Sequence, residues 1–138
     1  MVDANAEVVR RALELNRSDI VNEGHIARAL DPWDPNCEFT SIMSAVEPET
    51  YRGHHGLRRY VEELSDSWDE WRMEVEDVSD VGSNTVIATF RSYLVGKGSG
   101  APVEARRAML AELSRGKVLR ARVYASREEA LEALKSPQ

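Results

Sequence analysis

The sequence contains very little cysteine, which excludes several kinds of site. Cys37 is the only cysteine among 138 residues, so neither a disulfide nor a thiolate metal cluster can form within one chain. Histidine is also scarce, with His25 and the adjacent pair His54 and His55. Adjacent helical side chains diverge by about 100°, so these three histidines do not make a metal site. We expect no metal and no cofactor.

The chain also lacks long apolar runs and excess positive charge. No apolar run reaches the ~20 residues needed to cross a bilayer, and residues 1–11 contain no apolar signal core. The formal net charge is −6, which disfavours binding to nucleic acid or to an anionic membrane. We therefore expect a soluble, cytoplasmic protein with no nucleic-acid partner and no membrane partner.

The first half of the chain is predicted to be largely helical. Apolar spacing predicts helices in residues 4–15 and 18–30, with Ser18 as an N-cap, and the segment "DPWDPN" at 31–36 has turn chemistry. A longer apolar stripe at helical spacing predicts a helix over residues 54–71. This stripe consists of Leu57, Tyr60, Val61, Leu64, Trp68 and Trp71. Without repeats or linkers, the simplest interpretation is a single domain over residues 1–138.

After residue 71 the apolar period changes from that of a helix to that of a strand. Strands are predicted in residues 72–78, 84–95, 102–113 and 117–125, and an earlier one in 37–43. Short glycine-containing connections between the later strands predict antiparallel hairpins. The segment "GKGSG" at 96–100 is therefore a hairpin turn and not a phosphate loop, which would lead into a helix. A last helix is predicted from Ser126, with Glu129 completing a capping box and Pro137 ending it.

Alternation along the strands predicts which side chains face the interior. In residues 103–113 and 118–125 the odd positions are mostly apolar, whereas the even positions include Arg106, Arg120 and Arg122. The same rule turns Cys37, Phe39, Ser41 and Met43 inward in the early strand. Applied to residues 84–95, it also turns Arg91 and Tyr93 inward.

Polar side chains on an apolar face suggest a ligand cavity. A buried guanidinium needs a carboxylate, water or ligand, so Arg91, Tyr93 and Arg107 are candidate binding residues, and Asp77 is a possible inward carboxylate. Two structural alternatives stay open: a β-bulge that reverses the local alternation, or a position near a strand end that reaches solvent. In particular, the residues leave open whether Arg107 faces the pocket or the outer sheet face.

The order of these elements resembles the SnoaL-like polyketide cyclase family, within the nuclear transport factor 2-like superfamily. The resemblance rests on a long helix after "YRGHHGLRRY", hairpin-linked strands, "RGKVLRARVY" and a short "REEALEAL" helix, and it covers nearly the whole chain. It implies an α+β fold, in which a curved antiparallel sheet wraps helices into a cone around a pocket. It also implies a homodimer built on the outer sheet face, near Arg106, Arg120 and Arg122, with Glu104 and Glu112 available to pair with them.

The resemblance does not supply a catalytic set. The cyclases use an aspartate and a histidine at positions that match Val123 and Met109, and valine cannot transfer a proton. The limonene-type epoxide hydrolases use a carboxylate, arginine, carboxylate set, of which only Arg91 is present, with Tyr93 and Val123 at the carboxylate positions. The catalytic residues are therefore unknown, and the sequence does not decide whether any reaction is catalysed.

Two functional hypotheses remain. In the first, a pocket binds a small, largely apolar ligand with a polar or anionic end, as in an isomerase, cyclase or hydrolase that lacks the usual catalytic aspartate. In the second, the chain is a non-enzymatic dimeric interaction module with a vestigial cavity. The candidate ligand-binding residues are Arg91, Tyr93, Arg107, Phe39, Ser41, Met109, Val123, Leu64 and Trp68.

Overall fold

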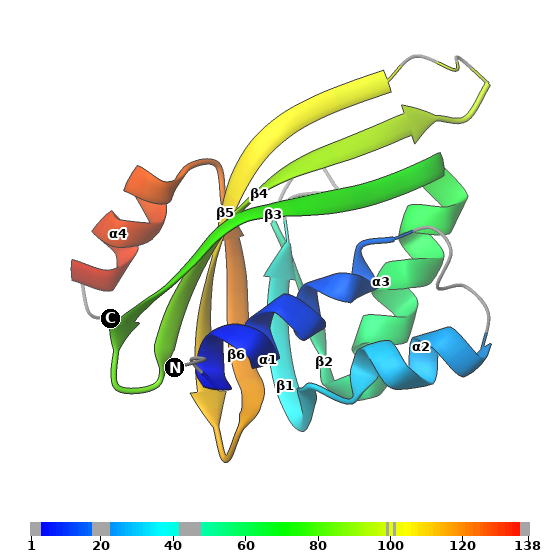
Figure 1. The fold of residues 1–138 in the computed structure, drawn as a ribbon. Coiled ribbons are helices and arrows are strands. Elements are labelled where there is room, and N and C mark those ends of the chain that lie inside the picture. The colour runs from blue at the N-terminus through cyan, green and yellow to red at the C-terminus, as the bar shows by residue number, and fades with distance from the viewer. Residues whose placement is uncertain (1–3, 18–22, 42–47, 99, 101, 136–138) are drawn as a thin grey trace.

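The structure is a computed structural model that describes residues 4–17, 23–41, 48–98, 100 and 102–135 (Figure 1). Its helices are α1 (Ala4–Ala12), the 3-10 helix η1 (Leu13–Leu15), α2 (Glu23–Leu30), α3 (Gly53–Ser67) and α4 (Arg127–Lys135). Its strands are β1 (Trp33–Ser41), β2 (Glu49–Arg52), β3 (Trp68–Gly82), β4 (Thr85–Gly96), β5 (Pro102–Ser114) and β6 (Lys117–Tyr124). These strands form one six-stranded sheet in the order β2-β1-β6-β5-β4-β3.

The sheet curves around helices, which gives the α+β fold expected from the sequence. Figure 1 shows α1, α2 and α3 on one side of the sheet and α4 against the other side. We call the sheet face that packs against α1 and α3 the inner face, and the opposite one the outer face. One apolar core joins Val9 of α1 and Leu64 of α3 to the inner face, whereas Ala130 of α4 packs against Ile87 and Ala108 on the outer face. No helix of the described residues is long and apolar enough to span a bilayer.

The three predicted hairpins are confirmed. Strands β3 and β4, β4 and β5, and β5 and β6 pair antiparallel, and β1 pairs with β2 in the same way. At the β5–β6 turn, Arg115 and Gly116 both have positive φ, as a two-residue type I′ hairpin turn requires. The sheet is nevertheless mixed, because β1 pairs parallel with β6.

The long helix is shorter than its apolar stripe predicts. Its residues Leu57, Tyr60, Val61 and Leu64 are buried as expected, but α3 ends at Ser67, and Trp68 and Trp71 belong to β3. A register shift between Trp68 and Glu70 inserts one extra residue into β3. Trp68 then pairs with Gly96 and Trp71 with Leu94, so both indoles lie on the inner face. Because of the bulge, two neighbouring inner-face residues of this strand are three positions apart in the sequence, which is a spacing typical of a helix.

The predicted alternation is confirmed in β1 and in most of β5 and β6, although the odd residue Val103 of β5 is exposed. Cys37, Phe39 and Ser41 are buried in β1, while Ala121 and Val123 are buried in β6. In β5 the odd residues Met109, Ala111 and Leu113 are buried. The prediction fails at Leu119, which is only partly buried. There a bulge opposite Glu112 and Leu113 brings Val118 into the core instead.

The predicted alternation is wrong in β4. Its buried inner-face residues are even: Val86, Ala88, Phe90, Ser92 and Leu94. The register confirms this, since Ala88 lies opposite Met109 and Phe90 opposite Arg107. The pattern was ambiguous because α4 covers the outer face at Ile87, so three consecutive residues of this strand are buried.

Two further local predictions are corrected near β1. The segment 31–36 is not only a turn, because β1 begins at the buried Trp33, with irregular pairing between Trp33 and Glu38. The short strand β2 was not predicted at all.

At the other end of the chain the capping box is confirmed, since the Glu129 amide donates to Ser126 Oγ at 3.2 Å. The expectations for Ser18, Met43 and Pro137 fall outside the described residues.

Candidate functional site

The inner face holds most of the predicted ligand-binding residues. Phe39, Ser41, Leu64, Met109 and Val123 are all buried there, and Trp68 packs against the same core. Met109 and Val123 lie directly opposite each other across β5 and β6. According to the resemblance described from the sequence, these are the positions of the histidine and aspartate of the cyclases, and in this chain both residues are apolar. The pair therefore offers contact area to a ligand but no proton.

Three polar atoms on the inner face are buried without a hydrogen-bond partner in the part of the chain that the structure describes. They are Trp68 Nε1, Trp71 Nε1 and Ser92 Oγ. The exposed fraction is 2% for Trp71 and 3% for Ser92, so water does not reach these two side chains from outside. A buried donor without a partner costs about 1 to 3 kcal/mol, and buried indoles usually find one. Sequence reasoning missed Trp71 and Ser92, because it placed one in a helix and the other on the outer face.

The strand register brings these three side chains to one end of the inner face. Trp68 lies opposite Gly96, Trp71 opposite Leu94, and Ser92 opposite Met73, at successive inner-face positions of β3 and β4. Trp71 and Ser92 are diagonal neighbours on adjacent strands, which are about 7 to 8 Å apart, whereas Trp68 lies one inner-face position further from Ser92. We call Trp68, Trp71 and Ser92 the donor cluster. It can donate hydrogen bonds and carries no charge.

A second polar group on the inner side, around the Tyr60 hydroxyl, is by contrast hydrogen-bonded. Tyr60 Oη donates to Asn16 Oδ1 at 2.6 Å, and Asn16 Nδ2 donates to the Leu13 carbonyl at 3.3 Å. Ser41 also hydrogen-bonds the Tyr60 hydroxyl, and burial raises the pKa of Tyr60 well above its usual value. This network ties the end of η1 to α3 and β1, and its groups are occupied with one another.

Arg91 and Tyr93 do not face the interior, which corrects the central prediction from the sequence. Both lie on the outer face with the odd residues of β4. Arg91 Nε is 3.2 Å from Glu104 Oε1, and Arg91 Nη2 is 3.9 Å from Glu76 Oε2. Its Nη1 donates to Tyr93 Oη at 3.3 Å, and this bond raises the pKa of Arg91 further, with help from both carboxylates. The guanidinium of Arg72 lies 4.2 Å from the centre of the Tyr93 ring.

We expect the Arg91→Met substitution to lower the free energy of unfolding by no more than about 1 kcal/mol, because the side chains of Arg91, Glu76 and Glu104 are all partly exposed. Urea unfolding measures this change, with Arg106→Met as the control, since Arg106 also pairs with Glu76 at 3.3 Å. A loss of about 3 kcal/mol or more would instead indicate a buried ion pair.

Arg107 occupies an inner-face position in the middle of β5, just beyond the point where its neighbour β6 ends. Strand β6 stops at Tyr124, which pairs with Ala108, so no residue of β6 lies opposite Arg107. Its Nη1 donates to the Arg106 carbonyl at 3.0 Å, and the side chain is partly exposed. The long stem can therefore carry the charge to water. Asp77 is exposed and accepts a hydrogen bond from Ser79 Oγ at 2.7 Å, so it brings no carboxylate inward.

No reactive thiol or metal centre emerges among the described residues. Burial raises the pKa of Cys37 to about 11, so its thiol stays protonated at neutral pH. In that part of the chain no three His, Cys, Asp or Glu side chains are grouped as metal ligands. His54 Nε2 lies 2.8 Å from the Trp33 carbonyl oxygen, which gives this ring a structural role.

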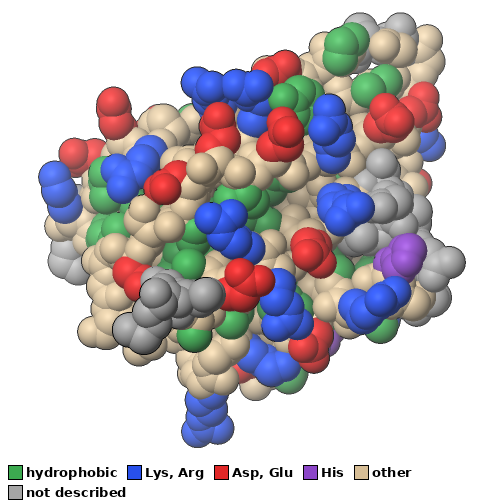
Figure 2. All heavy atoms as spheres, in the orientation of Figure 1, with side chains coloured by type: hydrophobic (Ala, Val, Ile, Leu, Met, Phe, Trp, Pro, Cys, Tyr) green, Lys and Arg blue, Asp and Glu red, His purple; other side chains and the backbone are tan. Residues whose placement is uncertain are grey.

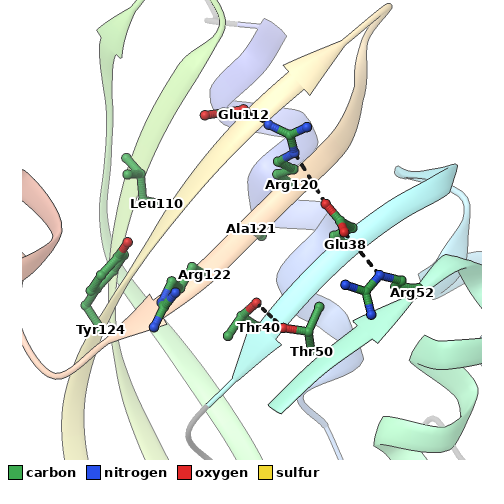
Figure 3. A pocket seen from close by; sticks show the side chains of 10 residues that line it. All are labelled: Glu38, Thr40, Thr50, Arg52, Leu110, Glu112, Arg120, Ala121, Arg122 and Tyr124. Carbon is green, nitrogen blue, oxygen red and sulfur yellow. Dashed lines mark hydrogen bonds and ion pairs between the residues drawn. The ribbon is translucent and has the colours of Figure 1, made fainter. Parts of the chain in front are cut away.

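The outer face carries a hollow of about 330 Å³ over β2, β1, β6 and β5 (Figure 3). Figure 3 shows Arg120 between Glu112 and Glu38, and Arg52 on the other side of Glu38. The distances are 3.7 Å from Arg120 Nη1 to Glu112 Oε2 and 3.4 Å from Arg120 Nε to Glu38 Oε2. The outward direction of the even-numbered charged residues Glu112, Arg120 and Arg122 is thus confirmed. Figure 2 shows that basic and acidic side chains are also mixed over the face of the molecule that is turned towards the viewer in Figure 1.

Comparison with known proteins identifies the family. The SnoaL-like domain model matches residues 16–121, so the chain belongs to the SnoaL-like family. Solved structures share the fold. An NTF2-like protein from Burkholderia thailandensis E264 aligns with a TM-score of 0.72 at 20% identity, covering 99% of this chain and 100% of that one.

Two further structures are similar to this chain. A putative SnoaL-like polyketide cyclase from Jannaschia sp. CCS1 aligns with a TM-score of 0.70 at 18% identity, covering 98% of this chain and 94% of that chain. TerC, co-crystallised with polyporic acid, aligns with a TM-score of 0.72 at 13% identity, covering 97% and 100%. No curated protein matches the sequence. These likenesses establish the fold, which supports many chemistries, and leave the activity to the site itself.

Proposed function

We propose that the chain binds a small, largely apolar molecule between the inner sheet face and helices α1 and α3. The observation that carries this proposal is the donor cluster, because a merely packed core has no reason to bury three polar atoms without partners. The surrounding inner-face side chains are apolar, as ligand pockets require. Co-crystallisation of the similar protein TerC with polyporic acid gives further support.

Binding is better supported than acid-base turnover. Val123 and Met109 replace the proton-transferring pair of the cyclases, and Tyr60 is held in hydrogen bonds with a raised pKa. Arg91 and Tyr93, the remaining candidates for a catalytic set, lie on the outer face. The protein is therefore proposed as a binding protein on a fold that its relatives share.

The proposal is tested by thermal unfolding in the presence of neutral ring compounds of increasing size, from benzene to tetralin to anthracene. A ligand that binds only the folded state raises the midpoint temperature with its concentration. Native mass spectrometry then counts the bound molecules, and one per chain is expected. If no compound raises the midpoint or binds, the interior is filled, and the alternative of an interaction module is favoured.

We also propose that two copies of the chain associate through their outer faces. A two-fold interface must be complementary to itself, and the outer hollow presents both signs of charge. Glu38 and Glu112 lie beside Arg52, Arg120 and Arg122 around this hollow. Facing copies can thus pair acidic with basic groups in both directions.

The dimer is expected to weaken at least about tenfold in the Arg122→Glu protein, because the substitution places like charges across the interface. Arg122 is suitable because it is exposed and lies over the Tyr124 ring, at 5.6 Å from its centre, and it forms no ion pair within the part of the chain that the structure describes. Light scattering at several concentrations measures the association. Arg10→Glu on the exposed surface of α1 makes the same charge change elsewhere and should leave it unaltered. A wild-type monomer at micromolar concentration would contradict the dimer.

A further inference from the structure

A second hollow, of about 300 Å³, lies beside the start of helix α4, which Figure 1 shows against the outer face. Residues of β3, β4 and β5 line it, together with the segment that joins β6 to α4. None of these residues lines the hollow over β2, β1, β6 and β5. The two hollows are therefore separate sites.

Three arginines line this second hollow, and two of them have no carboxylate partner. Arg106 Nε lies 3.3 Å from Glu76 Oε1, but Arg107 and Arg127 form no ion pair within the part of the chain that the structure describes. Glu76 is the one acidic residue among the described lining residues, and Arg91 shares it at 3.9 Å. Because arginine stays protonated at neutral pH, the lining carries excess positive charge on a chain with a net charge of −6.

The end of β6 explains how Arg107 reaches this hollow from an inner-face position. Strand β6 stops at Tyr124, opposite Ala108, so no residue of β6 separates Arg107 from the outer side. The Arg107 side chain is half-buried, and its Nη1 donates to the Arg106 carbonyl at 3.0 Å, which holds it beside Arg106. A guanidinium has five N–H donors, so most of them remain available to a ligand.

Two hydroxyl groups add neutral donors to the arginines. Thr89 Oγ1 of β4 has no hydrogen-bond partner among the described residues. Ser126 Oγ accepts from the Glu129 amide at 3.2 Å, which leaves its hydroxyl hydrogen free to donate. The Glu129 carboxylate in turn accepts from the Ala125 amide at 3.3 Å, so this turn of α4 is already capped. The helix therefore supplies the side chains of Ser126 and Arg127, and not a free helix end.

We propose that this hollow binds the phosphate group of a small phosphate ester. Donors from β4, β5 and α4 surround it, and a phosphate group offers several oxygens in different directions, whereas one arginine already satisfies a carboxylate. A water molecule takes up about 30 Å³ in the liquid, so a single phosphate ion fills only part of the hollow and leaves space for the organic part of an ester. This site lies outside the proposed inner pocket and does not depend on it.

The first test is titration calorimetry with glycerol 3-phosphate, with glycerate as the carboxylate and glycerol as the neutral compound. These polar compounds do not suit the apolar inner face, so their binding reports on the outer site. We expect one glycerol 3-phosphate per chain, bound at least about tenfold more tightly than glycerate, and no binding of glycerol. Inorganic phosphate should bind less tightly than the ester. Added salt should weaken the binding, because the arginines are partly exposed.

The backbone amide signals of ¹⁵N-labelled protein locate the bound phosphate. With glycerol 3-phosphate, the signals of Thr89, Arg107 and Ser126 should shift, because these residues line the hollow. The signal of Leu64, which is buried in α3 on the opposite side of the sheet, should stay in place.

Single substitutions separate a defined site from general attraction between charges. Arg107→Gln and Arg127→Gln should each lower the affinity for glycerol 3-phosphate about 3- to 10-fold and leave the unfolding midpoint unchanged, because neither breaks an ion pair among the described residues. Arg10→Gln removes the same charge from the exposed side of α1 and should leave the affinity unchanged. Thr89→Val keeps the shape of the side chain, so it should weaken binding while the midpoint holds or rises.

Absence of glycerol 3-phosphate binding would overturn the site, as would an equal loss of affinity in Arg10→Gln and Arg127→Gln. Equal affinity for glycerate would overturn the phosphate assignment, and equal affinity for inorganic phosphate would overturn the ester. Vesicles of phosphatidylcholine with phosphatidic acid test a lipid source. The protein should not sediment with them, because its net charge is negative, and sedimentation that Arg127→Gln abolishes would replace the small ester by a lipid headgroup. None of these results bears on the inner pocket, which is tested with neutral ring compounds.

Discussion

The Tyr60→Phe protein is expected to lose about 2 to 3 kcal/mol of unfolding free energy, although only one oxygen atom is removed. Tyr60 is fully buried, and its hydroxyl donates to Asn16 Oδ1 at 2.6 Å and is hydrogen-bonded by Ser41. Asn16 and Ser41 are buried as well, so both polar groups would lose this partner where water cannot replace it. Urea unfolding followed by circular dichroism measures the loss.

Tyr93→Phe is the matched control for this substitution. Tyr93 lies on the outer face, where its hydroxyl accepts from Arg91 Nη1 at 3.3 Å in a partly exposed setting. Its loss should change the free energy of unfolding by no more than about 0.5 kcal/mol. Equal effects of the two substitutions would show that the Tyr60 network does not hold η1, α3 and β1 together.

The hydrogen-bonded network around Tyr60 differs from the donor cluster in the same core. Its groups satisfy each other, whereas the donor cluster at the β3–β4 end of the same core is left without partners among the described residues. The contrast separates a polar group kept for folding from one that folding alone does not explain. Under the proposed binding function, a ligand would offset the cost of burying the donor cluster, whereas the hydrogen bonds of the Tyr60 network stabilise the fold.

The sequence predicts the fold because most of its signals are local and agree with one another. Charged residues alternate with apolar ones in β5 and β6. The short connection between these two strands, at Arg115 and Gly116, is typical of a tight hairpin turn. The apolar residues Leu57, Tyr60 and Leu64 repeat at helical spacing and are all buried in α3. Each such signal depends only on neighbours a few residues away.

The site is harder to predict, because it depends on contacts between distant segments. The orientation of β4 is set by its register with β5 and by α4, which buries Ile87 on the outer face and so conceals the alternation. The bulge after Trp68 likewise makes two strand residues look helical. The concealed alternation in β4 led to the wrong predictions that Arg91 and Tyr93 face inward and that Ser92 faces outward. The bulge led to the wrong prediction that Trp71 belongs to a helix. A bulge near a site is a common device for redirecting side chains.

The Gly56→Leu substitution is expected to be among the most damaging single changes in the chain, with a loss of about 3 kcal/mol in unfolding free energy. Helix α3 crosses β2 closely here: a Cβ atom at Gly56 would lie 3.0 Å from the carbonyl carbon of Tyr51. That atom belongs to the backbone of a buried strand residue and cannot move aside alone. Leucine would favour the helix by up to about 1 kcal/mol, which the overlap exceeds.

His55→Leu is the control, because it adds leucine to the same turn of α3 on its exposed side and should change the free energy of unfolding by about 0.5 kcal/mol or less. The helix also carries Leu57, Tyr60 and Leu64 onto the inner face, so pushing it away from β2 should disturb the proposed pocket. Any Gly56→Leu protein that folds should therefore lose its thermal response to tetralin, while His55→Leu retains it. If Gly56→Leu kept both its stability and its tetralin response, α3 would not be fixed against β2 by this close contact, and the pocket would not depend on where the helix lies.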